Sequence, residues 1–204
     1  MLCQRFAWFL PVALVACADA PPAPASTTSV PTAERPTMKV GDRWASTCTA
    51  GKKKTDVFTV ITTVDAVSIK GDVNGKRLIL TPDLNELEGL RWSHRPAVQL
   101  YSFPLEVGKS WSGTDEWTDE ENTDEGFEKV RVTVAGYERV RVPAGEFDAF
   151  RLEVAADWSS KQVYSGKTLA TVWYAPAARG QVKLQISVQG EPDMTCELTA
   201  LLLQ

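Results

Sequence analysis

Few residues in this sequence have the types and the spacing that catalysis requires. The only histidine, His94, follows Ser93, which places a hydroxyl beside an imidazole. Neighbouring residues of a strand point to opposite faces, so the two cannot act as nucleophile and base, and His94 is expected in a loop. Gly108-Lys109-Ser110 could end a phosphate-binding loop, but Phe103 stands where that motif needs its first glycine. We predict no catalytic residue, and we expect Lys109 in a turn between two strands.

Carboxylates are concentrated between Asp115 and Glu128, where eight of fourteen residues are acidic. Carboxylate oxygens are ligands for hard cations such as Ca²⁺. The spacing does not match an EF-hand loop, because Gly126 follows Asp119 by seven positions instead of five. The segment is therefore interpreted as a solvated hairpin loop. We predict no metal site and no cofactor.

A cysteine near the N-terminus carries the clearest chemical signal. The residues Leu14-Val15-Ala16-Cys17 close an apolar run that begins at Phe6 and follows Arg5, which is the pattern of a secretory signal. They resemble the bacterial lipoprotein box, in which Cys17 would be diacylated and become the mature N-terminus. The run is too short for a transmembrane helix, which needs about twenty residues. A plain secretory signal, cut after Ala16 or Ala18, is the alternative.

These signals divide the chain into three parts. Residues 1–16 are predicted to be the lipoprotein signal peptide. Residues 17–37 are predicted to be the lipidated cysteine and a disordered linker of Pro, Ala, Ser and Thr. Residues 38–204 remain for one β domain, which is long enough to bury a core. Because Ala18 rather than aspartate follows Cys17, the resemblance implies an outer-membrane anchor with the protein facing the periplasm.

Alternation of apolar and polar residues runs through most of this domain and predicts strands with one buried face. It is found in the segments 44–48, 58–66, 129–134, 150–154, 181–188 and 194–200. Pro143-Ala144-Gly145 has the turn chemistry of a hairpin. A short helical turn is expected only at Pro82 to Leu90. The many short strands predict an all-β antiparallel domain that is barrel-like or sandwich-like.

Two cysteines, Cys48 and Cys196, remain once Cys3 has left with the signal and Cys17 carries lipid. Alternation points both of them inward, in the first and last predicted strands. In an exported domain they are expected to form a disulfide, which would make these strands neighbours. It would close a loop of about 148 residues and stabilise the fold by roughly 5 kcal/mol. Two unrelated buried thiols are the alternative. A closed zinc site is excluded, because two cysteines and one histidine without CxxC spacing cannot form one.

Tryptophan is frequent in the predicted mature chain, at Trp44, Trp92, Trp111, Trp117, Trp158 and Trp173. Such residues in β proteins are usually core residues or members of cross-strand pairs. A ligand-lining role for Trp92, Trp111 or Trp173 is the alternative.

The composition excludes one class of partner. The formal net charge is −4, and the loss of Arg5 with the signal would make it −5. Nucleic-acid binding needs a basic surface, so we expect no nucleic-acid partner.

Four motifs together resemble a group of bacterial envelope β domains of unknown function, which are exported and often lipoproteins. They are FPLEVGKSW at 103–111, VPAGEFDAF at 142–150, WYAP at 173–176 and VGDRW at 40–44. The resemblance implies architecture, such as a hairpin at Pro143, and no catalytic residue.

These observations lead to an expected function. We expect a membrane-anchored, non-enzymatic lipoprotein whose β domain binds a hydrophobic ligand or an envelope partner. A structural or assembly lipoprotein without a ligand is the alternative, and a carboxylate-based hydrolase is the less favoured one.

Overall fold

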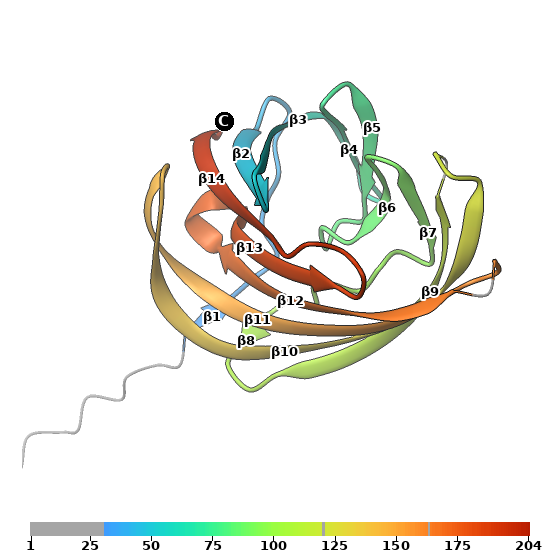
Figure 1. Cartoon of the computed structure of the whole chain (residues 1–204). Coiled ribbons are helices and arrows are strands. Elements are labelled where there is room, and N and C mark those ends of the chain that lie inside the picture. The colour runs from blue at the N-terminus through green and yellow to red at the C-terminus, as the bar shows by residue number, and fades with distance from the viewer. Residues whose placement is uncertain (1–30, 120, 163) are drawn as a thin grey trace, which may run out of the picture.

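The computed structural model describes residues 31–119, 121–162 and 164–204 (Figure 1). The elements are β1 (Thr32–Ala33), β2 (Arg43–Ala50), β3 (Lys53–Val64), β4 (Ile69–Val73), β5 (Lys76–Leu80), β6 (Glu86–Gly89), β7 (Trp92–Arg95), β8 (Leu105–Glu106), β9 (Ser110–Asp119), β10 (Asp124–Val142), β11 (Gly145–Ser160), β12 (Ser165–Ala175), the 3₁₀ helix η1 (Pro176–Ala178), β13 (Gly180–Val188) and β14 (Met194–Leu202). Within the described ranges, no helix has the length and apolar character needed to cross a membrane.

Twelve of these strands close into one antiparallel barrel. Their order is β10-β11-β12-β13-β14-β2-β3-β4-β5-β6-β7-β9, and the last strand in this order, β9, pairs with the first, β10, which closes the sheet. Strands β1 and β8 form a separate small sheet. The prediction of an all-β antiparallel domain is confirmed, and the architecture is a barrel rather than a sandwich. The predicted hairpin is also present, because Val142 pairs with Gly145 across Pro143 and Ala144.

Alternation along the strands separates the barrel interior from its surface. In β10 the residues Val130, Val132 and Val134 are buried, whereas the residues between them are exposed. The outer face carries ion pairs between neighbouring strands, such as Arg131 with Asp157. Exposed pairs of this kind contribute little to stability, so the buried apolar face holds the sheet together.

The segment between β7 and β9 packs against the inner wall of the barrel. The ring centroids of Tyr101 and Phe103 lie 5.4 Å from the centroid of Tyr174 on β12. Asn85 fixes the backbone of this segment, because its Nδ2 donates to Tyr101 O (3.0 Å) and its Oδ1 accepts from Tyr101 N (2.8 Å). Part of the interior is therefore filled by packed aromatic side chains.

A buried carboxylate ties both ends of the domain together. Asp42 is 0% exposed and accepts hydrogen bonds from Lys39 N, Arg179 Nη1 and Gln204 N, each at 2.8 Å. Trp44 Nε1 donates to Ala178 O (2.8 Å) in η1. The N-terminal approach, η1 and the C-terminus thus meet at one end of the barrel.

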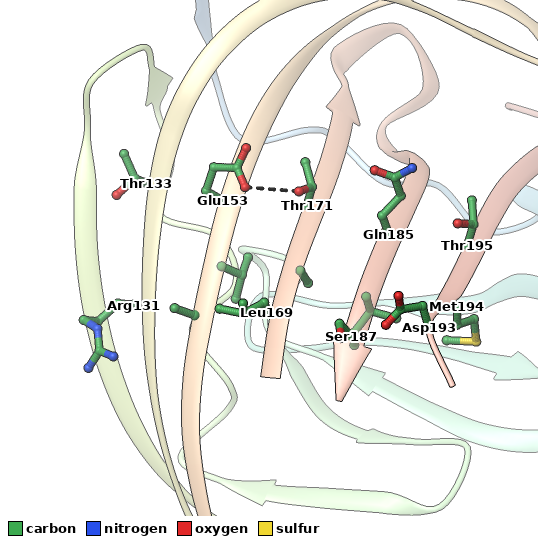
Figure 2. Close-up of a pocket in the computed structure, with 14 residues that line it drawn as sticks. Arg131, Thr133, Glu153, Leu169, Thr171, Gln185, Ser187, Asp193, Met194 and Thr195 are labelled. Carbon is green, nitrogen blue, oxygen red and sulfur yellow. Dashed lines mark hydrogen bonds between the residues drawn. The ribbon is translucent and has the colours of Figure 1, made fainter. Parts of the chain in front are cut away.

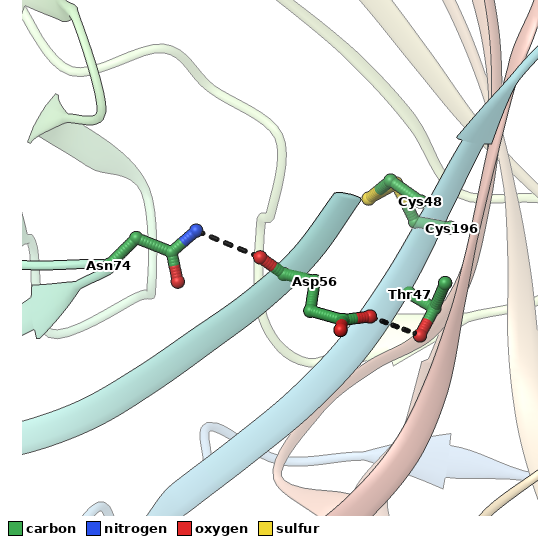
Figure 3. The surroundings of a disulfide bond; sticks show 5 residues. All are labelled: Thr47, Cys48, Asp56, Asn74 and Cys196. Atoms are coloured by element: carbon green, nitrogen blue, oxygen red, sulfur yellow. Dashed lines mark hydrogen bonds between the residues drawn. A yellow bond between two sulfur atoms is a disulfide. The ribbon is translucent and has the colours of Figure 1, made fainter. Parts of the chain in front are cut away.

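The predicted disulfide is present and joins the first and last barrel strands. Cys48 of β2 lies directly opposite Cys196 of β14, and their Cα atoms are 3.9 Å apart (Figure 3). On the other face of β2, Thr47 Oγ1 donates to Asp56 Oδ1 of β3 (2.7 Å). Asn74 Nδ2, in the turn after β4, donates to Asp56 O (2.9 Å).

Two predictions made from the sequence are corrected here. The helical turn at Pro82 to Leu90 is wrong, because Glu86 to Gly89 form strand β6, paired with β5 and β7. The disordered linker does not extend to residue 37, because β1 lies within it and Ala33 is 3% exposed. Residues 32–33 pair with β8, and this pairing could not be predicted from the high proline content of the segment.

Candidate functional site

The only histidine of the chain faces the barrel interior. His94 lies in β7 and is paired across the sheet with Trp117 of β9. Its Nδ1 donates a hydrogen bond to Asp115 Oδ2 (2.7 Å), and the two side chains are 12% and 1% exposed. The other carboxylate oxygen, Asp115 Oδ1, is buried without a hydrogen-bond partner among the described residues. The prediction of a loop position for His94 is therefore wrong.

His94 lines two cavities of the barrel. The first has a volume of about 470 Å³ and is mainly apolar. Its apolar wall comprises Met38, Trp44, Val57, Ile61, Leu78, Leu80, Leu84, Val98, Leu100 and Tyr101. The disulfide lies in the same wall, and Glu86 and Arg179 are its charged residues besides His94. The first cavity therefore resembles a ligand pocket, with much apolar surface and a few polar groups.

The second cavity has a volume of about 500 Å³ and is lined by tryptophans and carboxylates. Its tryptophans are Trp92, Trp117 and Trp158. Residues from the turns after β6, β9, β11 and β13 also line it: Arg91, Asn122, Tyr164 and Glu191. This cavity therefore lies at the barrel end formed by these four turns, whereas Asp42 lies at the other end.

One row of inward residues crosses four strands beside His94. Asp115 of β9 pairs with Glu128 of β10, Glu128 pairs with Trp158 of β11, and Trp158 pairs with Gly166 of β12. Two carboxyl groups thus stand directly opposite one another. Like charges in this position destabilise a sheet unless a proton or a cation separates them.

Two glycines let the tryptophan rings lie against the barrel wall. A Cβ atom added at Gly166 would stand 2.4 Å from Trp158 Cζ2, and one at Gly126 would stand 2.5 Å from Trp117 Cζ2. The rings therefore occupy the space that side chains would fill on β12 and β10. Because the rings lie along the wall, the volume in front of them stays open.

Burial and charge shift the pKa values of Glu86, Glu128 and His94. Burial raises the pKa of Glu86, although His94 opposes this. Burial also raises the pKa of Glu128, and the Asp115 carboxylate raises it further. For His94, burial lowers the pKa, but the hydrogen bond and charge of Asp115 outweigh it, so the net pKa is raised. Groups with such shifts in a cavity are candidates for function.

The acidic segment forms the predicted hairpin between β9 and β10, but it is not solvated throughout. Asp119 is 2% exposed. It accepts hydrogen bonds from Arg91 Nη2 (2.5 Å), Asn122 Nδ2 (2.8 Å) and Glu121 N (3.0 Å). Burial raises its pKa, but these donors outweigh burial and hold the pKa below its usual value. Asp115 and Asp119 are buried because they fall on the inward positions of β9.

The three tryptophans proposed as ligand-lining residues occupy different places. Trp92 lines the second cavity, where Arg91 stacks over its ring at 4.5 Å. Trp111 is half-buried, and its Nε1 donates to Gln99 O (2.9 Å). Trp173 Nε1 donates to Glu138 Oε1 (2.7 Å). Cys17 lies outside the described residues.

The sequence interpretation did not identify Trp117, Trp158, Glu86 or Glu128 as site residues. Alternation within 110–119 could have placed Asp115 and Trp117 on one inward face. The position of Glu86 could not be predicted, because its segment was assigned to a helical turn.

A further hollow, of about 670 Å³, lies on the outer surface of β10 to β14 (Figure 2). It is lined by polar residues that include Arg131, Gln185 and Thr195, and Thr171 Oγ1 donates to Glu153 Oε2 (3.1 Å). Apolar residues such as Leu169 and Met194 line it too, but its charged residues Arg131, Glu153 and Asp193 make it a weaker candidate for an apolar ligand than the first cavity.

Comparison with known proteins identifies the fold. No protein-family model and no curated protein matches the sequence. A candidate exported protein of Bacteroides fragilis with a YmcC-like fold aligns over 83% of this chain and 99% of its own, with 13% identity and a TM-score of 0.58. A candidate lipoprotein of Parabacteroides distasonis aligns over the same shares, 83% and 99%, with 11% identity and a TM-score of 0.57. The barrel therefore has the YmcC-like fold.

Proposed function

We propose that this protein is an exported, lipid-anchored lipoprotein whose barrel binds an apolar or amphipathic ligand without chemical turnover. The anchor rests on Cys17 in its lipoprotein-box context, and on structural neighbours that are named as exported or lipoprotein candidates. The ligand rests on two cavities that share His94 as a lining residue, one mainly apolar and the other lined by tryptophans and carboxylates. Such a pair suits a molecule with an apolar chain and a polar end.

Filling the apolar cavity tests ligand binding. Ser46 lines this cavity from β2, so Ser46→Phe should occupy its volume and abolish binding of decanol. Thr49→Phe places the same ring on the opposite face of β2 and should leave binding unchanged. Binding is measured by isothermal calorimetry on the exported chain carrying Cys17→Ser, which removes the acyl chains. If wild type and both variants bind decanol equally, the ligand is not in this cavity. If none binds decanol, an envelope protein partner becomes the better proposal.

Labelled palmitate tests the anchor. The wild-type chain should incorporate the label and sediment with outer membranes, whereas Cys17→Ser should do neither. Continued labelling of Cys17→Ser would contradict the proposal, and labelled wild-type protein in inner membranes would contradict the outer-membrane part.

A carboxylate-based hydrolase is the second candidate, favoured by one observation. Glu86 and Glu128 are half-buried carboxyl groups with raised pKa values that interact with one histidine, as general acids do. Incubation with chromogenic esters and glycosides tests it. A hydrolysis rate that Glu86→Gln or Glu128→Gln abolishes would favour the enzyme over the binding protein, and no hydrolysis by wild type would leave the binding protein.

A further inference from the structure

The second cavity carries more negative than positive charge. Among the residues that the structure describes, the side chain of Glu128 makes no hydrogen bond or ion pair, and the same holds for the side chain of Glu86 in the adjoining cavity. Within the described part of the chain, Asp115 also keeps one buried carboxylate oxygen without a hydrogen-bond partner. Neither cavity is lined by a lysine. The polar side chains of the two cavities therefore include hydrogen-bond acceptors that no described donor uses.

The cations already present are engaged. Arg91 pairs with Asp119 and stacks over Trp92, although its Nε is buried and has no hydrogen-bond partner among the described residues. Arg179, in the first cavity, pairs with Asp42 at the far end of the barrel. His94 donates its hydrogen bond to Asp115, and although its charge also acts on Glu128, Glu128 faces the Asp115 carboxyl group across the sheet. No cation among the described residues donates a hydrogen bond to Glu128.

The walls of this cavity suit a cation as well. Trp158 pairs directly with Glu128, and its ring lies against the barrel wall over Gly166. Trp117 lies over Gly126, and Trp92 meets it edge-on at 5.3 Å. Tryptophan rings attract cations through their negative faces, most strongly where water is excluded. Arg91 over Trp92 already uses this interaction within the chain.

We propose that the second cavity binds the ammonium group of an amphipathic amine, between Glu128 and the ring of Trp158. This inference rests on the proposed function, because the apolar chain of the amine would extend past His94 into the first cavity. The ammonium donates hydrogen bonds to Glu128 and separates its charge from that of Asp115. The site therefore selects amines over acids and alcohols of the same chain length.

Three probes of equal chain length test the selectivity. Decylamine, decanol and decanoate are titrated at pH 7 into the exported chain carrying Cys17→Ser, with tryptophan fluorescence and calorimetry as readouts. Decylamine should bind about tenfold or more tighter than the other two, as a desolvated cation–aromatic contact predicts. Glu128→Gln should reduce decylamine affinity to that of decanol and leave decanol unchanged, which also shows that the variant is folded. Glu116→Gln is the matched control, because Glu116 is exposed beside Asp115 and faces outward.

The outcomes separate this inference from the proposed function. Equal affinities for all three probes would overturn the amine selectivity and leave a general apolar ligand site. If none of the three probes binds, both the amine selectivity and the proposed ligand binding are overturned. Equally tight binding of spermidine, which carries ammonium groups without an apolar tail, would overturn the amphipathic class.

Discussion

At the residue scale, the pair of His94 and Asp115 can be observed directly, because the chain has one histidine. We predict that proton NMR titration of the imidazole gives a pKa above the ordinary value of about 6.5. Asp115→Asn removes the charge that raises the pKa most and keeps the burial that lowers it, so the pKa should fall, although the charges of Glu86 and Glu128 still raise it. A pKa that Asp115→Asn does not lower would contradict the assigned hydrogen bond.

The same shift has a consequence for stability. A histidine whose folded pKa is raised stabilises the fold below its unfolded pKa, and this contribution is lost as pH rises through the folded pKa. The raised pKa values of Glu86 and Glu128 act in the same direction, because burial makes their charged forms less stable in the barrel than in the unfolded chain. The sequence placed His94 and Ser93 on opposite faces correctly, but it could not identify Asp115 as a partner from a different strand.

A second residue-scale prediction concerns the acidic hairpin. Asp119→Asn should lower the free energy of unfolding by about 1–3 kcal/mol, because the buried carboxylate accepts charge-assisted hydrogen bonds from Arg91 and Asn122 that the amide cannot replace. Glu121→Gln removes only an exposed pair with Lys76 and should change stability by less than about 1 kcal/mol. Urea denaturation of both variants measures the difference. If both variants change the free energy of unfolding by the same small amount, the whole acidic segment behaves as a solvated loop.

At the element scale, the second cavity depends on one position of β12, Gly166, which has no side chain. Gly166→Ala should displace Trp158 from the wall, because the new Cβ would stand 2.4 Å from the ring. We predict a destabilisation of about 1–3 kcal/mol and a shift in tryptophan emission. Gly136→Ala is the control, since its Cβ would meet only Arg151 atoms at 3.6 Å or more. Unchanged emission in Gly166→Ala would show that the ring does not depend on this glycine.

The elements differed in how far the sequence could predict them. Regular alternation predicted parts of β2, β3, β10, β11, β13 and β14, because each buries one face along several residues. Strands β6 and β7 have only four residues each, which is too short for a period to be recognised. Pairing with neighbouring strands imposes their conformation: β6 pairs with β5, and β7 pairs with β9, which is distant in sequence.

At the scale of the whole molecule, the sequence predicted an antiparallel β domain but left barrel and sandwich open. Whether the sheet forms a barrel depends on β9, which pairs with both β7 and β10 and so closes the sheet. Local alternation carries no information about such long-range pairing. The inward faces of individual strands were predictable, whereas the cavities were not, because an open interior depends on Gly126 and Gly166 beside tryptophans of other strands.

The disulfide gives the last prediction, because it constrains almost the whole domain. Cys48 and Cys196 are 148 residues apart, so the bond removes much conformational freedom from the unfolded chain. Reduction should lower the free energy of unfolding by about 5 kcal/mol, the chain-entropy value for a loop of this length. The double variant Cys48→Ala/Cys196→Ala should unfold near the reduced wild type and should not respond to reductant. Peptide mapping of the exported, unreduced protein should recover the two cysteines in one linked fragment. Free thiols at both positions would leave them as ordinary core residues, and a reductant effect that persists in the double variant would assign the stability to another cause.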